Sequence, residues 1–472
     1  MTVNRTLATG ADARERAPVE LVRVPLRCRL APAQVLHALG GQPLPFALVG
    51  SWAGGGAIVG SEPLRVAGDA EDPIAVLDDL PPLGAAPPGN GAVGGGWFGW
   101  LGYRLAARVE RVPLTGHRPV ALPEFHLAYY DNVLHLDGDG TWWFEALASG
   151  ARRRALDDRL RRLHDLLERV PPTNRSDRAV TPAPPLRLTA RHAAHHLDAV
   201  RECRARIAAG EIFQANICLR LDARCDQGPV TLLRRALDRV AAPYAAAFAT
   251  PRGGIVSLSP ELFLRRRGRD VVTGPIKGTA PRDPNPAAAA AALERLRRSE
   301  KDAAEHVMIV DLMRNDIGRV CEYGSIVAPR RPIAEAHPGV WHLVSHVRGR
   351  LRPDVGDGDL LRATFPPGSV TGAPKVQSLR VIAELEPTGR EVYTGAIGFA
   401  SPLAGLELNV AIRTLELSAG RMWLGAGGGI VADSDPRTEL EEALAKARPI
   451  AAALGTSVLV ESGRRQDVRR AA

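Results

Sequence analysis

The sequence predicts a mixed α/β protein, and three observations support this class. Strand-like runs punctuated by glycine and proline fill residues 20–145. A helical segment follows over 151–170, where leucines recur at helical spacing among arginines and acidic residues. Beyond it, helices such as 195–209 are followed by alternating strands such as 212–221. The content of 45% hydrophobic and 24% charged residues is typical of a globular chain rather than a disordered one.

The remaining elements follow in order along the chain. In the first half, the predicted strands lie at 46–49, 94–103, 127–136 and 142–147. The second half adds strands at 258–263 and 271–279, an alanine-rich helix after Pro286, and a helix over 299–314. A last helix begins with Asp435 as its N-cap and Pro436 in its first turn.

Length and composition bound the domain organisation. At 472 residues the chain is long enough for two domains or for one large interlocked domain. The segment 171–185 (PPTNRSDRAVTPAPP) has the composition of a linker. We therefore predict an N-terminal subdomain over 18–170, a linker over 171–185 and a second domain over 186–457, with tails at 1–17 and 458–472.

Charge and cysteine usage exclude several classes of function. The net charge is +9, but the arginines of 151–170 alternate with acidic residues, aromatic content is 5%, and no nucleic-acid-binding motif accompanies them. Five cysteines without a CxxC pair argue against a disulfide framework or a zinc site. The sequence has neither an apolar run of eighteen residues nor an apolar N-terminal signal core, so we expect a cytoplasmic protein.

Lysine is rare in this chain, and one lysine occupies a notable place. Only four of the 61 basic residues are lysines, and Lys277 lies in VVTGPIKGT, after a strand and a Gly-Pro turn. Arginine keeps its proton near neutral pH, whereas a desolvated lysine can lose it and become a nucleophile. Sixteen residues upstream, Glu261 in SPELF lies between apolar runs, which raise the pKa of a carboxyl and suit it to proton transfer. A plain cross-strand ion pair, or a surface lysine, is the alternative.

Two further side chains point to a polar site. In the run 212–221, Gln214 and Asn216 lie on the face opposite the apolar residues, which include Phe213, and so point to solvent or to a site. Glu305 lies on the apolar stripe of its helix. A buried carboxylate needs a partner such as a bound cation. The alternative is a side chain at the edge of the stripe that reaches water.

The C-terminal region offers ligands for an anionic substrate and a metal. Glu439, Glu442 and Lys446 follow one another at i, i+3 and i+7 on the last helix, although a solvated Glu442–Lys446 pair is an alternative. Carboxylates on two helices, without cysteine or histidine nearby, suit Mg²⁺. Backbone N–H groups of the run 425–429 can bind a carboxylate.

Other polar residues lie in strand-like runs and in one loop. Arg413 can grip a carboxylate through two hydrogen bonds, and Tyr393 lies in a similar run. The loop 365–375 (FPPGSVTGAPK) carries hydroxyls at Ser369 and Thr371. Considered by itself, His342 in VWHLVSHV is a candidate for a buried core histidine.

These pieces in this order resemble the chorismate-utilising enzymes, which include the large subunits of anthranilate synthase and aminodeoxychorismate synthase and the isochorismate and salicylate synthases. The matching stretches span 210–447: GEIFQANI, SPELF, PIKGT, AEHVMIVDLMRND, WHLVS, FPPGSVTGAPK, YTGAIG, NVAIRT, GAGGGIVADSDP and ELEEALAKA. The resemblance implies two antiparallel β-sheets packed as a sandwich core and flanked by helices. It also implies that 186–457 is the chorismate-binding catalytic domain.

Within the family, the PIKGT stretch resembles aminodeoxychorismate synthase, since anthranilate synthases have PIAGT at this point. The resemblance implies that the Lys277 amine adds at C2 of chorismate and displaces the 4-hydroxyl, after which ammonia attacks C4 and expels the lysine. Glu261 would be the general acid and base, and His342 would lie near the ring. Gln214 stands where isochorismate-forming enzymes carry a water-activating lysine.

The resemblance also implies ligands and a partner. Mg²⁺ would be held by Glu305 and Glu442, with Glu439 assisting. The positions that match substrate contacts are Gln214, Thr279, Thr371, Tyr393, Arg413, Gly427, Gly429 and Lys446. No glutamine-hydrolysing domain is visible in the sequence, so we expect a separate glutaminase subunit to deliver ammonia. The rival interpretations are an anthranilate synthase large subunit and a non-catalytic chorismate-binding subunit.

Overall fold

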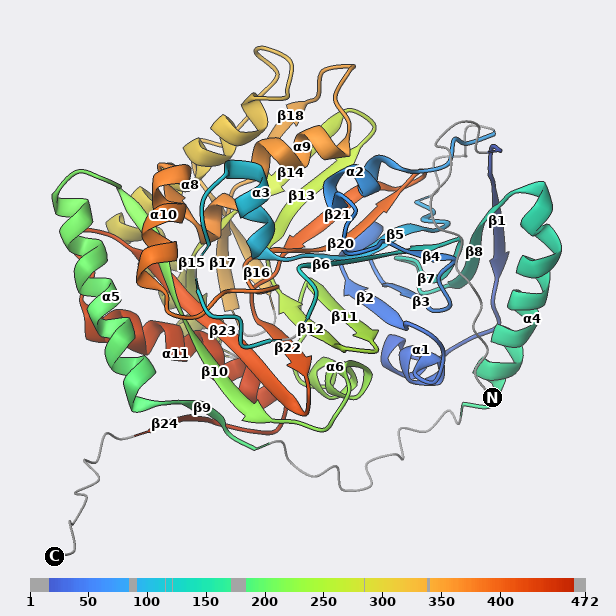
Figure 1. Ribbon diagram of the computed structural model, residues 1–472, viewed down its shortest axis with the longest axis horizontal. Helices are drawn as coiled ribbons and strands as arrows, with labels where there is room; N and C mark the ends of the chain where they lie inside the picture. Colours follow the sequence, from blue (N-terminus) through green and yellow to red (C-terminus); the bar gives the residue numbers. More distant parts are fainter. Residues whose placement is uncertain are drawn as a thin grey trace, which may run out of the picture.

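The computed structural model describes residues 17–84, 91–114, 116–120, 122–170, 184–283, 285–337 and 340–461. In these residues two large β-sheets lie between helices (Figure 1). The first sheet has, in spatial order, β1 (Glu20–Pro25), β8 (Trp142–Ala148), β7 (Asn132–Leu136), β3 (Ala57–Gly60), β2 (Phe46–Gly50), β11 (Tyr244–Thr250), β12 (Gly253–Ser259), β22 (Thr414–Ser418), β23 (Arg421–Ile430), β10 (Gln214–Arg224), β9 (Leu186–Leu188) and β24 (Val458–Val460), with β19 (Gly372–Ala373) paired to β10.

The second sheet and a small third one complete the β-structure of the described residues. The second has the order β18 (Val347–Arg350), β14 (Asp270–Gly274), β13 (Leu262–Arg267), β21 (Gly405–Val410), β20 (Ala396–Ser401), β5 (Gly96–Leu101), β6 (Phe125–Tyr130) and β4 (Arg65–Val66). The third has β15 (Ile276–Pro281), β17 (Val340–Val344) and β16 (Ile333–His337). Apart from the pair β24–β9, these strands pair antiparallel, as the sequence comparison with the family implied.

Helices pack against the two large sheets, and α7 (Pro286–Arg297) packs against the small third sheet. They are α1 (Pro32–Leu39), α2 (Pro73–Asp78), α3 (Ala106–Glu110), α4 (Arg153–Glu168), α5 (Ala190–Ala208), α6 (Pro229–Leu237), α7, α8 (Glu300–Gly318), α9 (Asp357–Thr364), α10 (Lys375–Leu385) and α11 (Pro436–Ala453). Asp435 caps α11 as predicted, since its side chain accepts hydrogen bonds from the backbone N–H groups of Arg437 and Thr438. Within the described residues, no helix is long and apolar enough to cross a membrane.

The three largest apolar cores of the described residues hold the layers together. One lies between the two large sheets, where Phe46 of β2 stacks on Phe98 of β5 with ring centroids 4.5 Å apart. A second lies between the first sheet and α1, α4, α6 and α11. The third joins the second sheet to α2, α8 and α9. The predicted sandwich of two antiparallel sheets flanked by helices is therefore confirmed.

Both large sheets combine strands from the two halves of the chain. In the first, Ala47 of β2 pairs with Ala247 of β11. In the second, Gly99 of β5 pairs with Gly398 of β20. The length allows either two domains or one large interlocked domain, and the sheets show the interlocked arrangement. The predicted boundary at 171–185 therefore separates stretches of sequence that share the same sheets.

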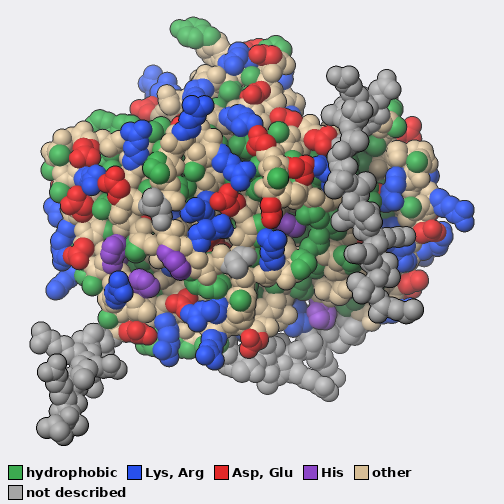
Figure 2. Space-filling view, viewed as in Figure 1, with side chains coloured by type: hydrophobic (Ala, Val, Ile, Leu, Met, Phe, Trp, Pro, Cys, Tyr) green, Lys and Arg blue, Asp and Glu red, His purple; other side chains and the backbone are tan. Residues whose placement is uncertain are grey.

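The segments around the predicted domains differ in how much of them is described. Most of the predicted linker, 171–183, lies outside the described residues, as do 1–16 and 462–472 of the predicted tails. The tail from 458 begins with β24, which pairs parallel with β9, so its first three residues are part of the first sheet. Basic and acidic side chains are interspersed on the face that Figure 2 shows, in keeping with the mixed charge pattern of the sequence.

The strand predicted over 212–221 starts later than expected. We predicted that Phe213 shares the apolar face of the run 212–221, but β10 begins at Gln214 and the Phe213 side chain is 71% exposed. The prediction for Phe213 is therefore wrong, because Phe213 precedes the first paired residue of β10. The polar residues Gln214 and Asn216 are instead buried, at 1% and 7% exposure.

Candidate active site

The chain changes sheets immediately before Lys277. Strand β14 ends at Gly274 in the second sheet and β15 begins at Ile276 in the third, so the predicted Gly-Pro turn is the crossing point. Within β15, Ile276 pairs with Val344 and Thr279 with His342, which gives β15 one extra residue. This is a β-bulge at Lys277 and Gly278, and Gly278 has a φ of +84°. A bulge changes the direction of a side chain locally. Here the side chain concerned is that of Lys277.

Lys277 lies between α8 and the glycine-rich end of β23. Its Nζ atom is 3.5 Å from Oε2 of Glu305 on α8, and the two side chains are 13% and 14% exposed. A Cβ atom added to Gly429 would lie 2.0 Å from Nε2 of Gln214 and 3.3 Å from Nζ of Lys277. The structure thus brings Lys277, Glu305, Gln214 and Gly429 together, and a side chain at position 429 would displace the Gln214 amide.

Gln214 ends in a polar atom that the described protein leaves unsatisfied. Its side chain is buried, and Oε1 has no hydrogen-bond partner among the described residues. Leaving a buried acceptor unpaired costs about 1–3 kcal/mol. A ligand that donates a hydrogen at this point would recover that free energy, so Gln214 is suited to contact a bound molecule.

Glu261 has the properties of a group that transfers a proton near neutral pH. It lies between β12 and β13, is 4% exposed, and its backbone is held by Ser259 and Val410. Burial raises the pKa of its carboxyl to about 7, while a hydrogen bond with Ser369 and the charge of Lys277 act in the opposite direction. The sequence-based expectation that apolar surroundings raise this pKa agrees with the structure.

His342 and Thr279 form a pair across two strands. They are directly opposite in β17 and β15, and Nδ1 of His342 lies 3.0 Å from Oγ1 of Thr279. The histidine side chain is buried, with 1% of its surface exposed. Because Thr279 lies two residues beyond Lys277, this contact ties the imidazole on β17 to the short strand β15 that carries the lysine.

Arg413, Thr371 and Tyr393 lie on loops around the same region. Arg413 has a φ of +51°, and burial lowers the pKa of its guanidinium although the charge of Glu261 acts against this. Thr371 is fully buried, and its carbonyl accepts a hydrogen bond from the Asn216 N–H at 2.7 Å. The ring of Tyr393 covers Gly425, where an added Cβ would lie 2.3 Å from it.

Lys446, Glu439 and Glu442 surround Gly428 of β23. Nζ of Lys446 donates to the Gly427 carbonyl at 2.9 Å and lies 2.8 Å from Oε1 of Glu442. A Cβ on Gly428 would lie 3.3 Å from Oε2 of Glu439. Oε1 of Glu439 accepts a hydrogen bond from the Ser434 hydroxyl.

The three glutamates expected to hold a metal do not form one group. Glu305 lies beside Lys277, whereas Glu439 and Glu442 lie beside Gly428. Among the residues described, no three His, Cys, Asp or Glu side chains come together so as to hold a metal ion. Glu305 and Glu442 each contact a lysine in this arrangement. Their oxygen chemistry suits Mg²⁺, although a lysine ammonium lies beside each of these two carboxylates.

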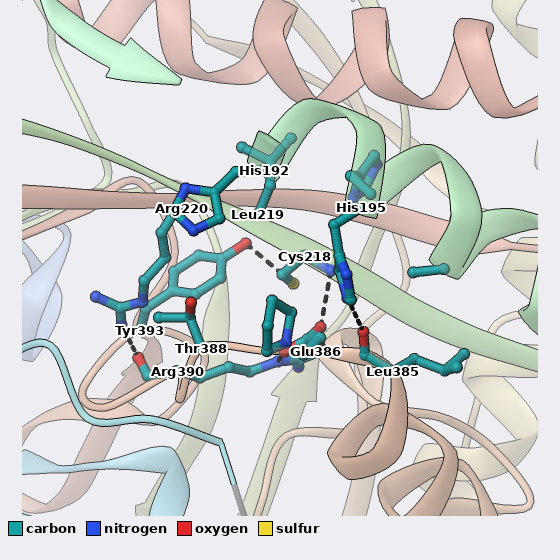
Figure 3. Close-up of a pocket in the computed structure, with 13 residues that line it drawn as sticks. His192, His195, Cys218, Leu219, Arg220, Leu385, Glu386, Thr388, Arg390 and Tyr393 are labelled. Atoms are coloured by element: carbon teal, nitrogen blue, oxygen red, sulfur yellow. Dashed lines mark hydrogen bonds and ion pairs between the residues drawn. The ribbon is translucent and has the colours of Figure 1, made fainter. Parts of the chain in front are cut away.

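A cavity lies behind Tyr393, between α5, β10 and the loop that follows α10 (Figure 3). The Tyr393 hydroxyl is 3.6 Å from Sγ of Cys218, and the Cys218 N–H donates to Glu386. Glu386 in turn pairs with Arg390 at 2.6 Å, with both side chains buried. A Cβ on Gly427 would lie 2.7 Å from Sγ of Cys218, so the cavity adjoins the glycine-rich strand.

Sequence reasoning missed two buried ion pairs beside the site. Glu386 and Arg390 are four residues apart, a spacing that could have indicated the pair. Lys375 pairs with Asp316 at 2.5 Å. These two residues are 59 positions apart, and no local pattern indicates their contact.

Comparisons with known proteins place the chain in a family. The chorismate binding enzyme family matches residues 67–452. Anthranilate synthase component 1 of Streptomyces coelicolor is 35% identical over 473 residues, covering 96% of this chain and 92% of that protein. Aminodeoxychorismate synthase component 1 of Salmonella typhimurium is 36% identical over 388 residues, covering 80% and 82%. The crystal structure of anthranilate synthase component I from Streptococcus pneumoniae superposes with a TM-score of 0.70 at 26% identity and 95% coverage of each chain. The chain therefore belongs to the chorismate binding enzyme family.

Proposed function

We propose that this chain is the large subunit of an aminodeoxychorismate synthase, which converts chorismate and ammonia to 4-amino-4-deoxychorismate for 4-aminobenzoate formation. Relatives named for two different reactions match it at 35% and 36% identity, so identity alone does not choose between them. The observation that carries the proposal is the amine of Lys277, presented by a bulge beside Gln214 and within the electrostatic reach of Glu261.

In the first step, the neutral Lys277 amine adds at C2 of chorismate, and the nitrogen releases one proton to solvent. The two ring double bonds each shift by one position, and the 4-hydroxyl leaves as water with a proton from Glu261. A carboxyl with a pKa of about 7 holds that proton in a large fraction of molecules at neutral pH. The product is a lysine adduct at C2 with no substituent oxygen at C4.

In the second step, ammonia attacks C4, the double bonds return, and the C2–nitrogen bond to Lys277 breaks. As the C2–nitrogen bond breaks, the lysine nitrogen takes up one proton from solvent, which replaces the proton released in the first step, and leaves as an amine. The Glu261 carboxylate accepts the proton that the new C4 ammonium group releases. The unpaired Oε1 of Gln214 is an acceptor beside Lys277. An amide is not a base that activates water, which favours amination over hydration.

The proposal includes a metal and a partner. Glu305 and Glu442, with Glu439 assisting, would hold Mg²⁺, which would neutralise the ring carboxylate of chorismate. Relatives are named as component 1 of their enzymes, which supports a separate glutaminase subunit that supplies ammonia. Free ammonia would then replace that subunit in vitro.

Product analysis tests the proposal. The purified chain is incubated with chorismate, Mg²⁺ and ammonium at mildly alkaline pH, and the product is identified by mass and ultraviolet spectrum, with and without a lyase that forms 4-aminobenzoate. A non-aromatic amino product that the lyase converts to 4-aminobenzoate supports the proposal. Anthranilate as the product would favour the second candidate, anthranilate synthase, whose relative covers 96% of the chain. No turnover with ammonium would favour a chorismate-binding subunit without catalysis.

A further inference from the structure

Lys375 is a buried lysine for which the proposed reaction gives no role. It is the first residue of α10 and is 9% exposed. Its Nζ donates to Oδ2 of Asp316 at 2.5 Å, to the Thr364 carbonyl at 2.8 Å and to the Pro366 carbonyl at 3.0 Å. An ammonium group has three hydrogens, so each one has an acceptor.

These three acceptors belong to three different segments. Asp316 lies on α8, about three turns beyond Glu305 on the same helix. Thr364 ends α9, and Pro366 begins the turn that leads to Ser369 and Thr371. One side chain therefore joins the helix that carries the partner of Lys277 to the turn that carries two hydroxyls of the site.

The turn itself lies between α8 and β10. Gly368 packs against α8, since an added Cβ would lie 2.3 Å from Cε of Met313. On the other side, Ala373 pairs with Gln214, and Thr371 accepts a hydrogen bond from Asn216. The Ser369 side chain lies close enough to Glu261 to lower the pKa of its carboxyl. A shift of this turn would therefore move Ser369 and Thr371 relative to the proposed acid and to Gln214.

The residue type at 375 also has a physical reason. In a chain whose basic residues are almost all arginine, three of the four lysines, at 277, 375 and 446, lie on segments of the site. A compact ammonium matches three acceptors arranged around a point, whereas a guanidinium is a larger planar fork. Arginine at 375 would keep the charge opposite Asp316 without matching the two carbonyls.

We propose that Lys375 is a positioning residue for the proposed amination, which holds the turn 365–371 at a fixed distance from α8 and so keeps Ser369 on Glu261. This inference rests on the proposed function. The hydrogen bond from Ser369 stabilises the ionised form of Glu261. Its loss would therefore raise the pKa of Glu261 above about 7, which gives the proposal a specific readout.

The test compares four variants with the wild type. Lys375→Met/Asp316→Leu removes both charges, so that neither is left buried alone, and Lys375→Arg keeps the charge. Ser369→Ala removes the hydroxyl directly, and a triple variant combines it with the double one. We measure kcat and kcat/KM for chorismate against pH at saturating ammonium, together with Tm. The assay follows the aminated product, whichever isomer forms. A failure of this inference can therefore be distinguished from a failure of the proposed function.

We expect the alkaline limb of kcat/KM to move to higher pH in the double variant and in Ser369→Ala, and to move no further in the triple variant. We also expect kcat to fall by about 10–100-fold, in line with the cost of small displacements of reacting groups. Lys375→Arg should recover Tm but not the position of the limb. ¹³C NMR of labelled glutamate carboxyls, assigned with Glu261→Gln, gives the same pKa without turnover.

Three results would overturn the proposal. In the first, Tm falls while the limb and the Glu261 titration stay at their wild-type pH, which would make the pair purely structural. In the second, the shifts of Ser369→Ala and the double variant add in the triple variant, so Lys375 would act by another route. In the third, Lys375→Arg restores the limb fully, so that charge alone would suffice.

Discussion

The surroundings of Lys277 and Lys375 differ in how fully the protein satisfies the amine. Lys375 has acceptors at 2.5, 2.8 and 3.0 Å and lies where three segments meet. Lys277 lies on a bulge of a three-stranded sheet, with Glu305 at 3.5 Å and glycine opposite. A saturated ammonium is fixed as part of the architecture. An amine with an ion-pair contact of 3.5 Å is held less tightly than one with three short hydrogen bonds, so the same residue type serves two purposes.

Removing the Lys277 amine should have the largest effect on catalysis. Lys277→Ala is expected to lower formation of the 4-amino product by on the order of 10³-fold or more, because the covalent step is lost. Ammonia is then free to attack C2, so a trace of anthranilate is expected. Product analysis by mass and ultraviolet spectrum measures both.

Lys277→Arg is the matched control for this prediction. It retains a positive charge opposite Glu305 but has no amine that can act as a nucleophile near neutral pH. Its rate should be as low as that of Lys277→Ala. A rate near that of the wild type in either variant would remove Lys277 from the chemistry.

Replacing the proposed acid should have the next largest effect. Glu261→Gln is expected to lower kcat by about 10²–10⁴-fold, the usual worth of general acid catalysis. The wild-type rate should fall as pH rises through about 7, because Glu261 then loses the proton that it donates. The variant should lack this limb. A pH profile of kcat/KM for chorismate measures it, and an unchanged limb would assign the titration to another group.

Removing Lys375 should destabilise the fold more than removing Lys277, although Lys277 is expected to matter more for catalysis. Lys375→Met leaves Asp316 buried without its cation, and we expect a loss of about 3–5 kcal/mol in the free energy of unfolding. Lys277→Met should cost less, about 1 kcal/mol, because Glu305 stays partly exposed to water. Urea unfolding of both variants measures this. Equal losses would contradict the distinction drawn between the two sites.

Glu261 should also make stability depend on pH. Its pKa in the folded protein is about 7, above the ordinary 4.5, so the folded state binds more protons than the unfolded state between these values. The free energy of unfolding therefore falls as pH rises from about 4.5 to about 7, by about 3 kcal/mol from this group. Comparing urea unfolding of the wild type and Glu261→Gln across this range measures the contribution, which the variant should lack.

Much of the site was predictable because its signals are local. The alternation around β10 correctly separated Gln214 from its apolar neighbours, and the apolar runs around Glu261 correctly predicted a raised pKa. The N-cap at Asp435 needs only three residues of sequence. The assignment of Lys277 came from its rarity and from its resemblance to a family motif, and its role stays a prediction.

The remainder depends on contacts between distant segments. The bulge at Lys277 exists only in register with His342 and Val344, more than sixty residues later. The pairing of β2 with β11 and of β5 with β20 interlocks the two halves, and a linker-like composition at 171–185 says nothing about sheet partners. Phe213 fits the alternation of β10 but lies before its first residue. Sequence patterns indicate which residues share one face of a strand. The pairing of strands from distant parts of the chain decides which of those faces become buried.

The smallest expected effect concerns the carboxylate that contacts Lys277. If Glu305 leaves the lysine to bind Mg²⁺, Glu305→Gln should raise the Mg²⁺ concentration for half-maximal activity by on the order of 10–100-fold, while saturating Mg²⁺ restores much of the rate. A titration of activity with Mg²⁺ at saturating chorismate measures this. Glu441→Gln is the matched control, because Glu441 lies on the same helix as Glu442 but pairs with Arg448 on the surface. An unaltered titration in Glu305→Gln would remove Glu305 from the metal site, and the arrangement seen around Lys277 would then be its working state.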